Sequence, residues 1–300
     1  MQQPLISILM TVYNREKYIA QAIQSVLDSS YSNWELIIVD DQSTDKSVEI
    51  AYKFEKIDKR INVYVNEKNL GDYPNRNKAA SYAKGKYIKY LDSDDLIYPH
   101  GLEVMVTSME LFPKAGFGIS WHTTKTLIPF PFCVSSRDVY KQQFLGNGFF
   151  SIGPTGAIIK REIFEELGKF TEMRYSGDFD SWLKFSAEYD VVVFQPGLHW
   201  WRIHEEQEYN LGQDPSKYLK CTTQISLKYL TYIRSPLYNN ETKLAIQCLK
   251  QRQARMFYSH VLKLNFKYAY KYYINSSITL KSLFKGLKKS KIHFNIWDNL

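Results

Sequence analysis

Three carboxylates lie within four positions at the end of a predicted strand. The stretch KYIKYLDSDDLIYP, residues 86–99, begins with apolar residues and continues into Asp92, Asp94 and Asp95. Side chains two positions apart on an extended segment project to the same side, so Asp92 and Asp94 are expected to face one cleft. Like charges this close repel one another unless a cation or hydrogen-bond donors lie between them. The spacing therefore predicts a cation or a set of donors at this strand end, whereas Asp95 is assigned to a turn or to a helix cap.

Two further predicted strands also end in polar residues. TVYNRE, residues 11–16, follows the first strand, and DDQSTD, residues 40–45, follows the second. In a parallel α/β sheet, ligands bind outside the carboxyl ends of the strands. Mg²⁺ and Mn²⁺ are held by one or two carboxylates together with substrate phosphates. Because the chain has neither GxGxxG after the first strand nor GxxxxGK[ST] anywhere, we expect a metal rather than a glycine-rich loop to hold a phosphorylated ligand.

The elements that must position these residues alternate between strand and helix. Buried strands are predicted at 5–12, 34–39, 61–65 and 86–91, and helices at 16–27, 43–56, 75–83 and after Pro99. This alternation predicts an α/β fold with a mostly parallel sheet. Residues 113–175 are predicted to alternate between strand and loop. A helix at 178–188, a strand at 190–195 and helices beyond 216 follow.

Length and composition exclude several classes of protein. A chain of 300 residues with 44% apolar residues can bury a sizeable core. Its apolar stretches stay well below the roughly 18 residues that a transmembrane helix needs, and its start lacks the pattern of a secretory signal. The three cysteines form no CxxC pair, so neither a disulfide framework nor a zinc site is predicted. We expect a cytoplasmic protein.

Charge divides the chain into two parts. From Lys217 onward the sequence has 16 Lys and Arg against 2 acidic residues, a net charge of +14, whereas residues 1–216 have 23 against 29, a net charge of −6. Because both the charge and the apolar pattern change here, we predict a catalytic domain at 1–216 and a helical, basic C-terminal region at 217–300.

The basic region combines Lys and Arg with Tyr, Phe and Leu at helical spacing, as interfacial helices do. The preferred interpretation is peripheral attachment to the inner face of the cell membrane. The alternative is a solvated basic face on helices that pack against the catalytic domain. Nucleic acid is not an expected partner, because the chain has no RRM, KH or helix-turn-helix signature.

Four sequence blocks together resemble the family 2 glycosyltransferases, which have the GT-A fold. They are SILMTVYNREKYIAQAIQSVL, WELIIVDDQSTDKS, NLGDYPNRNKAASYAKGKYIKYLDSDDLIYP and SGDFDSWLKF, and the likeness covers about residues 4–205. The resemblance implies a Rossmann-like sheet flanked by helices. It also implies inverting transfer of a sugar from a nucleotide-diphosphate donor, with UDP-sugars favoured, to a saccharide or lipid-linked acceptor, assisted by Mn²⁺ or Mg²⁺. Bacterial surface polysaccharide synthesis is the expected process.

The resemblance also implies roles for single residues on the donor side of the site. The residues that would bind the donor or the metal are Thr11 and Tyr13 at the nucleobase, Asp41 at the base or ribose, Arg76 near the nucleotide, Asp92 at the ribose or metal, Asp94 at the metal, and His204 at the metal or diphosphate.

The candidate general base lies in SGDFDSWLKF. On a helix, Asp178 and Asp180 are about 200° apart, so only one of them can face the site. Asp180 is expected to form an exposed ion pair with Lys184 at i+4, which leaves Asp178 as the base. The resemblance agrees, although the family's usual Glu-Asp pair falls on Gly177 and Asp178 and so lacks its Glu. The alternative is that Asp178 only caps the helix.

Two rival functions are compatible with parts of the sequence. A sugar nucleotidyltransferase would share the sheet and the acidic metal site, but it would carry a glycine-rich loop with Arg and Lys directly after the first strand. This chain has TVYNREKY there. A non-catalytic nucleotide- or carbohydrate-binding module would keep the fold and lose the base.

Overall fold

The computed structural model describes residues 3–121, 126–205, 207, 217–286 and 294–295. The chain packs into two compact units whose segments interleave along the sequence. The first unit consists of the chain up to Val134 with Ser151–Arg174 and Tyr189–Ile203, and the second consists of Ser135–Phe150, Tyr175–Glu188 and the chain from His204 onward. The predicted domain division at residue 216 stays a prediction.

The first unit contains the strands and the helices that flank them. In chain order its first elements are β1 Ile6–Val12, α1 Ile19–Leu27, β2 Trp34–Asp40, α2 Ser47–Ile57, β3 Ile61–Val65, α3 Asp72–Ala80 and β4 Tyr87–Tyr90. These are followed by β5 Leu96–Ile97, α4 Gly101–Leu111, β6 Phe117–Ser120, β7 Phe132–Val134, η1 Pro154–Gly156, β8 Ala157–Lys160, α6 Arg161–Glu166, β9 Val191–Phe194 and β10 His199–Trp200. The predicted alternation over the first 111 residues is confirmed.

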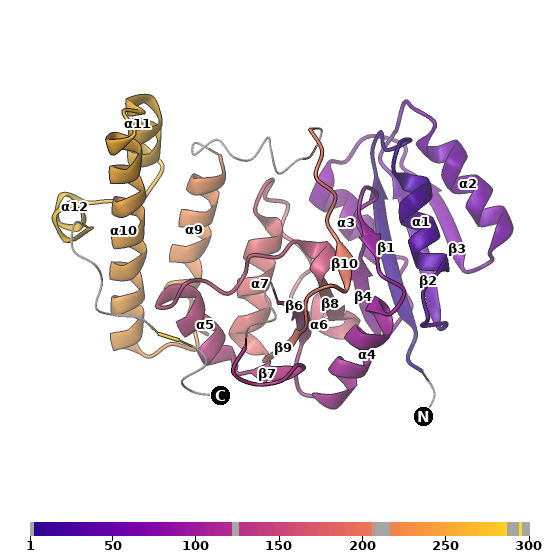
Figure 1. The fold of residues 1–300 in the computed structure, drawn as a ribbon, viewed down its shortest axis with the longest axis horizontal. Coiled ribbons are helices and arrows are strands. Elements are labelled where there is room, and N and C mark those ends of the chain that lie inside the picture. The colour runs from indigo at the N-terminus through magenta and orange to yellow at the C-terminus, as the bar shows by residue number, and fades with distance from the viewer. Residues whose placement is uncertain (1–2, 122–125, 206, 208–216, 287–293, 296–300) are drawn as a thin grey trace. The chain divides into compact units, whose positions relative to one another are not determined.

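The main sheet has the order β3-β2-β1-β4-β8-β6-β9-β7. Strands β3, β2, β1 and β4 run parallel to one another, as do β6 and β9. Strand β8 pairs antiparallel with β4 and β6, and β7 pairs antiparallel with β9. The mostly parallel α/β sheet predicted from the sequence is therefore confirmed. Strand β1 lies between β2 and β4, so the three polar segments that follow these strands meet at one edge (Figure 1).

Alternating side chains of β1 determine what packs on each face of the sheet. Ile6, Ile8 and Met10 belong to a buried cluster that also contains Ile19 and Ile23 of α1. The other face carries an aromatic cluster in which the rings of Tyr73, Tyr90, Phe164 and Phe170 lie 5.1–6.2 Å apart. Burial on both faces is what a parallel sheet requires, and it fixes the strand ends that carry the site.

Residues 113–175 differ from the prediction, because two helices lie within the segment predicted as strand and loop. One is α6, and the other is α5, Ser136–Phe144. The Ser135 side chain caps α5 by accepting a hydrogen bond from the backbone N–H of Asp138, and Tyr140 and Phe144 are buried. The helix was missed because it is short and mostly polar and lies between Pro- and Gly-rich stretches.

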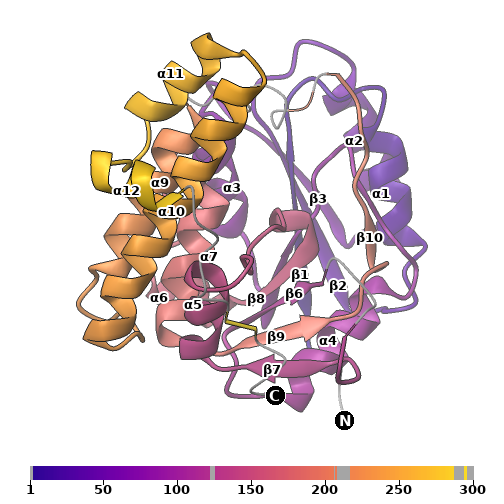
Figure 2. The same cartoon turned by 60° about the vertical axis from the view of Figure 1, so that its left-hand side comes forward.

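The second unit is helical. It contains α5, α7 Gly177–Glu188, α9 Tyr218–Leu230, α10 Asn239–Leu262, α11 Phe266–Ile274 and α12 Leu280–Gly286 (Figures 1 and 2). The long helix α10 contacts α5, α9, α11 and α12, so it organises this unit. The helices predicted beyond residue 216 are confirmed. In the described part of the chain, none of the helices has the length and apolar character that crossing a membrane requires.

Candidate functional site

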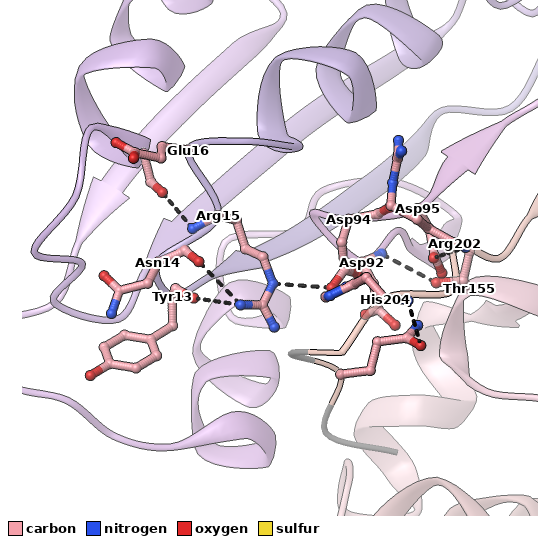
Figure 3. A network of polar contacts seen from close by, with 12 residues as sticks. Tyr13, Asn14, Arg15, Glu16, Asp92, Asp94, Asp95, Thr155, Arg202 and His204 are labelled. Carbon is pink, nitrogen blue, oxygen red and sulfur yellow. Dashed lines mark hydrogen bonds and ion pairs between the residues drawn. The ribbon is translucent and has the colours of Figure 1, made fainter. Parts of the chain in front are cut away.

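Arginines lie beside the acidic pair at the end of β4. Arg76 Nη1 lies 2.7 Å from Asp92 Oδ1. Arg15 Nε donates a hydrogen bond of 3.0 Å to Asp94 Oδ2 (Figure 3). Arg15 comes from the segment after β1 and Arg76 from α3. Donors therefore accompany both carboxylates, in line with the expectation that this much negative charge needs a partner.

Arg15 is held by the segment that follows β1. Its Nη1 donates to the carbonyl oxygens of Tyr13 and Asn14 at 3.3 and 3.1 Å (Figure 3). Asn14 adopts φ 52°. Its backbone N–H donates to Ser43 Oγ, and its side-chain Oδ1 accepts from the backbone N–H of Thr44, both in the segment after β2. Hydrogen bonds thus join the segments after β1 and β2, and they hold Arg15 at the edge of the sheet where Asp94 lies. Sequence reasoning missed Arg15, although a cation just after the first strand of an acidic edge is a usable signal.

Arg76 links α3 to the end of β4. Its Nε donates to Asp72 Oδ1 at 2.8 Å, one turn earlier on the helix, and the hydroxyl of Tyr90 donates to its carbonyl oxygen. Burial acts to raise the pKa of Asp92, but the charge of Arg76 outweighs it, and the pKa of that carboxyl lies below its usual value. Asp92 is therefore ionised at neutral pH.

Asp95 is a buried structural residue. Its N–H donates to the carbonyl of Asp92 at 2.9 Å, and its carboxylate accepts from the N–H of Arg202 at 3.0 Å (Figure 3). Burial, followed by the charge of Asp92, raises the pKa of Asp95 to about 7. The predicted turn is confirmed. The predicted helix cap is wrong, because β5 lies between Asp95 and the start of α4.

A lysine not anticipated as a site residue lies beneath the acidic pair. Lys89 of β4 is fully buried, and its Nζ donates to the carbonyl oxygens of Tyr90, at 2.9 Å, and Thr155. Thr155 Oγ1 in turn accepts from the N–H of Asp92 at 3.2 Å (Figure 3). Lys89 therefore ties the end of β4 to η1, and burial lowers its pKa to about 7.

The buried lysine predicts a pH dependence of stability. In the unfolded chain its pKa is about 10.4, so between pH 7 and 10 the unfolded state binds more protons than the folded state. The free energy of unfolding should then rise with pH across that window. Lys89→Met removes this titration. The free energy of unfolding of the wild type, minus that of the variant, should therefore increase as the pH rises. Urea denaturation of both proteins measures it, and parallel pH profiles would contradict the lowered pKa.

Three predicted donor-binding residues also lie at this edge. Thr11 lies in β1 just before its last residue, Val12, and Tyr13 follows the strand with half of its surface exposed. Asp41 is buried, and its carboxylate accepts hydrogen bonds of 2.8 Å from the N–H groups of Leu70 and Gly71. Asp41 thus anchors the segment before α3, and its contact with a donor stays a prediction.

The two acidic residues of α7, in the second unit, have different surroundings. Asp178 is half-buried in the first turn, where its Oδ1 accepts from the N–H of Phe179 at 2.7 Å. Asp180 is fully buried, bound by Lys228 Nζ at 3.0 Å and by the hydroxyl of Tyr229 at 3.2 Å. The predicted exposed pair of Asp180 with Lys184 is wrong, because α9 packs against α7 and encloses this carboxylate.

His204, the last predicted donor-side residue, also belongs to the second unit. Its N–H donates to Gln207 Oε1 at 3.2 Å (Figure 3). Its role toward a metal or a diphosphate stays a prediction, as does the role of Asp178 as base.

The carboxylates of the β4 end fit a metal that the ligand helps to coordinate. Across the residues that the structure describes, no cluster of three or more His, Cys, Asp or Glu side chains is suited to hold a metal ion. Asp92 and Asp94 can supply two carboxylates, and Mg²⁺ commonly takes its remaining ligands from water and substrate phosphates. The residues present therefore suit a metal that binds together with a phosphorylated ligand.

Comparisons with known proteins agree on one family. The model of the family described as "Glycosyl transferase family 2" matches residues 7–168. An uncharacterized glycosyltransferase of Methanocaldococcus jannaschii is 30% identical over 224 residues, which cover 70% of this chain and 74% of the relative. The putative teichuronic acid biosynthesis glycosyltransferase TuaG of Bacillus subtilis is 48% identical over 93 residues, which cover 31% of this chain and only 37% of the relative.

Solved structures share the fold at low sequence identity. TarS 1-349 of S. aureus, in complex with UDP-GlcNAc, matches with a TM-score of 0.68 and 18% identity, covering 94% of this chain and 81% of that one. The mannosyltransferase PcManGT of Pyrobaculum calidifontis, in complex with GDP-Man and Mn²⁺, matches with a TM-score of 0.60 and 15% identity, covering 96% and 82%. The predicted GT-A architecture is confirmed.

Proposed function

Since this chain belongs to the family 2 glycosyltransferases, we propose that it transfers a sugar from a nucleotide-diphosphate donor to a hydroxyl group of a saccharide or lipid-linked acceptor, with inversion. The observation that carries this proposal is the sheet edge at which Asp92 and Asp94 lie beside Arg76 and Arg15. Similarity to a protein named for teichuronic acid biosynthesis supports a role in bacterial surface polysaccharide synthesis.

The donor site that we propose is built on the ends of β1, β2 and β4. Tyr13 offers an exposed ring on which a nucleobase can stack. Arg76 holds a guanidinium group beside Asp92, and such a group suits the oxygens of a nucleotide. Thr11, Asp41, Asp92 and His204 complete the set of donor-binding residues. We propose UDP-sugars as the first candidates, which the fold's likeness to a UDP-GlcNAc complex supports.

Asp94 and Asp92 are the residues that would hold Mn²⁺ or Mg²⁺. When bound, such an ion stabilises the negative charge that develops on the leaving diphosphate. A Mn²⁺ complex among proteins of this fold supports the choice of metal. Because only two carboxylates are offered here, we expect metal and donor to bind together.

Asp178 is the proposed general base. It would accept the proton of the acceptor hydroxyl as that oxygen attacks the anomeric carbon from the face opposite the diphosphate. One in-line displacement inverts the configuration, and no covalent intermediate with the protein is required.

Donor binding should stabilise the folded protein in a metal-dependent way. We expect the correct nucleotide sugar, tested in a panel of UDP-, GDP- and TDP-sugars, to raise the melting temperature in the presence of Mn²⁺ or Mg²⁺. At a donor concentration about 100 times its Kd the gain in free energy of unfolding is about 2.7 kcal/mol. Addition of EDTA should abolish the shift. A panel without any metal-dependent shift would count against the proposed donor site.

A lipid-linked acceptor would bring the enzyme to the inner face of the cell membrane. We propose that residues 217–300 make this contact, because that region has a net charge of +14. The enzyme would then work in the cytoplasm and attach peripherally.

A further inference from the structure

Helix α11 turns large apolar side chains outward. The side chains of Phe266, Tyr270 and Ile274 are 61%, 66% and 55% exposed, whereas Ala269 is buried (Figure 2 shows the helix). Residues at i and i+4 lie about 40° apart around a helix, so these three form one continuous stripe. A surface helix normally turns such a stripe toward the core. In α11, Ala269 is buried and Tyr272 packs against His260 of α10, whereas the residues of this stripe turn outward.

Two leucines shortly before α11 are exposed as well. Leu262, at the end of α10, and Leu264 are both more than three-quarters exposed. Leu262, Leu264, Phe266, Tyr270 and Ile274 are called the α11 face below. Its members lie within 13 consecutive residues of the chain. Exposed apolar residues gathered in this way indicate a surface with a partner.

Lysines border the α11 face. Viewed along the helix axis, Lys267 and Lys271 lie about 20° and 60° beyond Ile274, at one side of the stripe. Lys263 lies in the preceding loop. Lysine stems can lie along an apolar surface while their ammonium groups reach the polar layer beside it. Lysines at the edge of an apolar stripe are therefore the arrangement of a helix that lies at a lipid interface.

The charge of the surrounding chain favours an anionic partner. Between Glu241 and Asp298 the sequence has 12 Lys and Arg residues and no Asp or Glu. A twofold dimer formed through this face would bring the lysines of both copies to one interface, with no acidic residue of this part of the chain to offset them, and like charges oppose such a contact. Anionic lipid headgroups would instead neutralise them. A membrane therefore fits this surface better than a second copy of the chain.

We propose that the α11 face is the docking site for a membrane that contains anionic lipids. Its apolar side chains enter the boundary between headgroups and acyl chains, and Lys263, Lys267 and Lys271 bind the headgroup phosphates. The inference rests on the proposed membrane contact of residues 217–300 and names the surface that makes it. It does not depend on the sugar or on the base.

Vesicle binding of the full chain tests this inference. Wild-type protein should co-sediment with vesicles of equimolar phosphatidylcholine and phosphatidylglycerol, and much less with vesicles of phosphatidylcholine alone. The double variant Phe266→Ser with Ile274→Ser should bind the anionic vesicles at least about tenfold more weakly, since two apolar anchors are lost. Lys263→Gln with Lys267→Gln should weaken binding and reduce its dependence on salt.

A matched control comes from the first unit. Ile57 and Leu127 are both about three-quarters exposed, so Ile57→Ser with Leu127→Ser removes two exposed apolar side chains far from α11 in the sequence. This variant should bind vesicles like the wild type. Circular dichroism and thermal melting should show that all variants fold, because the replaced side chains are exposed.

Equal vesicle binding by the wild type and by the Phe266 and Ile274 variant would overturn the inference. If the wild type is also a dimer that this variant converts to a monomer, the face is assigned to a second copy of the chain. Sugar transfer to a water-soluble acceptor, measured in the same samples, separates the two proposals. Transfer without vesicle binding contradicts only the docking site, whereas vesicle binding without transfer counts against the proposed activity alone.

Discussion

Replacing Asp178 with asparagine is expected to lower the kcat of sugar transfer by about a hundredfold to ten-thousandfold, the usual contribution of a general base. The amide cannot accept the proton of the attacking hydroxyl, but it keeps the size of the side chain and an oxygen that can accept from the N–H of Phe179. Donor binding should therefore be retained. Steady-state kinetics gives kcat, and the metal-dependent thermal shift gives donor binding.

Asp180 provides a matched control on the same helix. It is two residues away, but it is buried against Lys228 and Tyr229. Asp180→Asn should lower the free energy of unfolding by roughly 1–3 kcal/mol, because a charge-assisted contact is weakened, and should leave kcat of the folded fraction much less affected. The two variants thus separate a loss of chemistry from a loss of stability.

The outcome also decides between the proposed activity and its rivals. Unchanged turnover in Asp178→Asn would show that Asp178 only caps α7. A wild-type protein that binds the donor without transferring its sugar would be a binding module. A wild-type protein that makes the nucleotide sugar from a sugar phosphate would be a nucleotidyltransferase.

The fold of the first 111 residues could be predicted because its signals are local. Ile19, Ile23 and Val26 recur at helical spacing, and runs such as WELIIV have the length and composition of buried strands. Helix α5 could not be predicted in this way. It is held by the burial of a few side chains such as Tyr140, whose hydroxyl donates to the carbonyl of Leu183, more than 40 residues away in the chain.

Residues of the candidate site could be predicted only where their position along the chain determines their position in the fold. Asp92 and Asp94 follow directly from a strand end, and the parallel order places them beside the end of β1. Partners that depend on contacts between distant segments could not be predicted. Asp180 illustrates the limit. Lys184 follows it by one helical turn, but the lysine that binds it is Lys228 of another helix, α9.

Lys89 shows the same limit within a strand. The pattern KYIKYL predicts a strand, but nothing in it says whether the second lysine reaches solvent. The structure encloses it, because β4 is an interior strand with β1 on one side and β8 on the other. The nearby carbonyl of Thr155, contributed by a distant turn, satisfies its ammonium group.

Asp94→Ala is expected to have the second large effect. If Asp94 holds the metal, its loss should lower kcat/KM by about a hundredfold to a thousandfold, the cost of removing one group that stabilises charge in the transition state. The metal-dependent part of the donor's thermal shift should disappear as well. Titration of activity with Mn²⁺ should show that more metal is needed for the activity that remains.

The ion pair with Arg15 offers a second interpretation, which the same experiment must separate. Asp94 binds Arg15 Nε at 3.0 Å, so Asp94→Ala also releases an arginine that the segment after β1 aims along the edge. Arg15→Met removes the arginine and keeps the carboxylate. If Asp94 is a metal ligand, Arg15→Met should retain the metal-dependent shift, and its Mn²⁺ requirement should stay the same or fall, because the guanidinium group no longer competes for the carboxylate. Equal losses in both variants and in the double variant would mean that Asp94 only anchors Arg15.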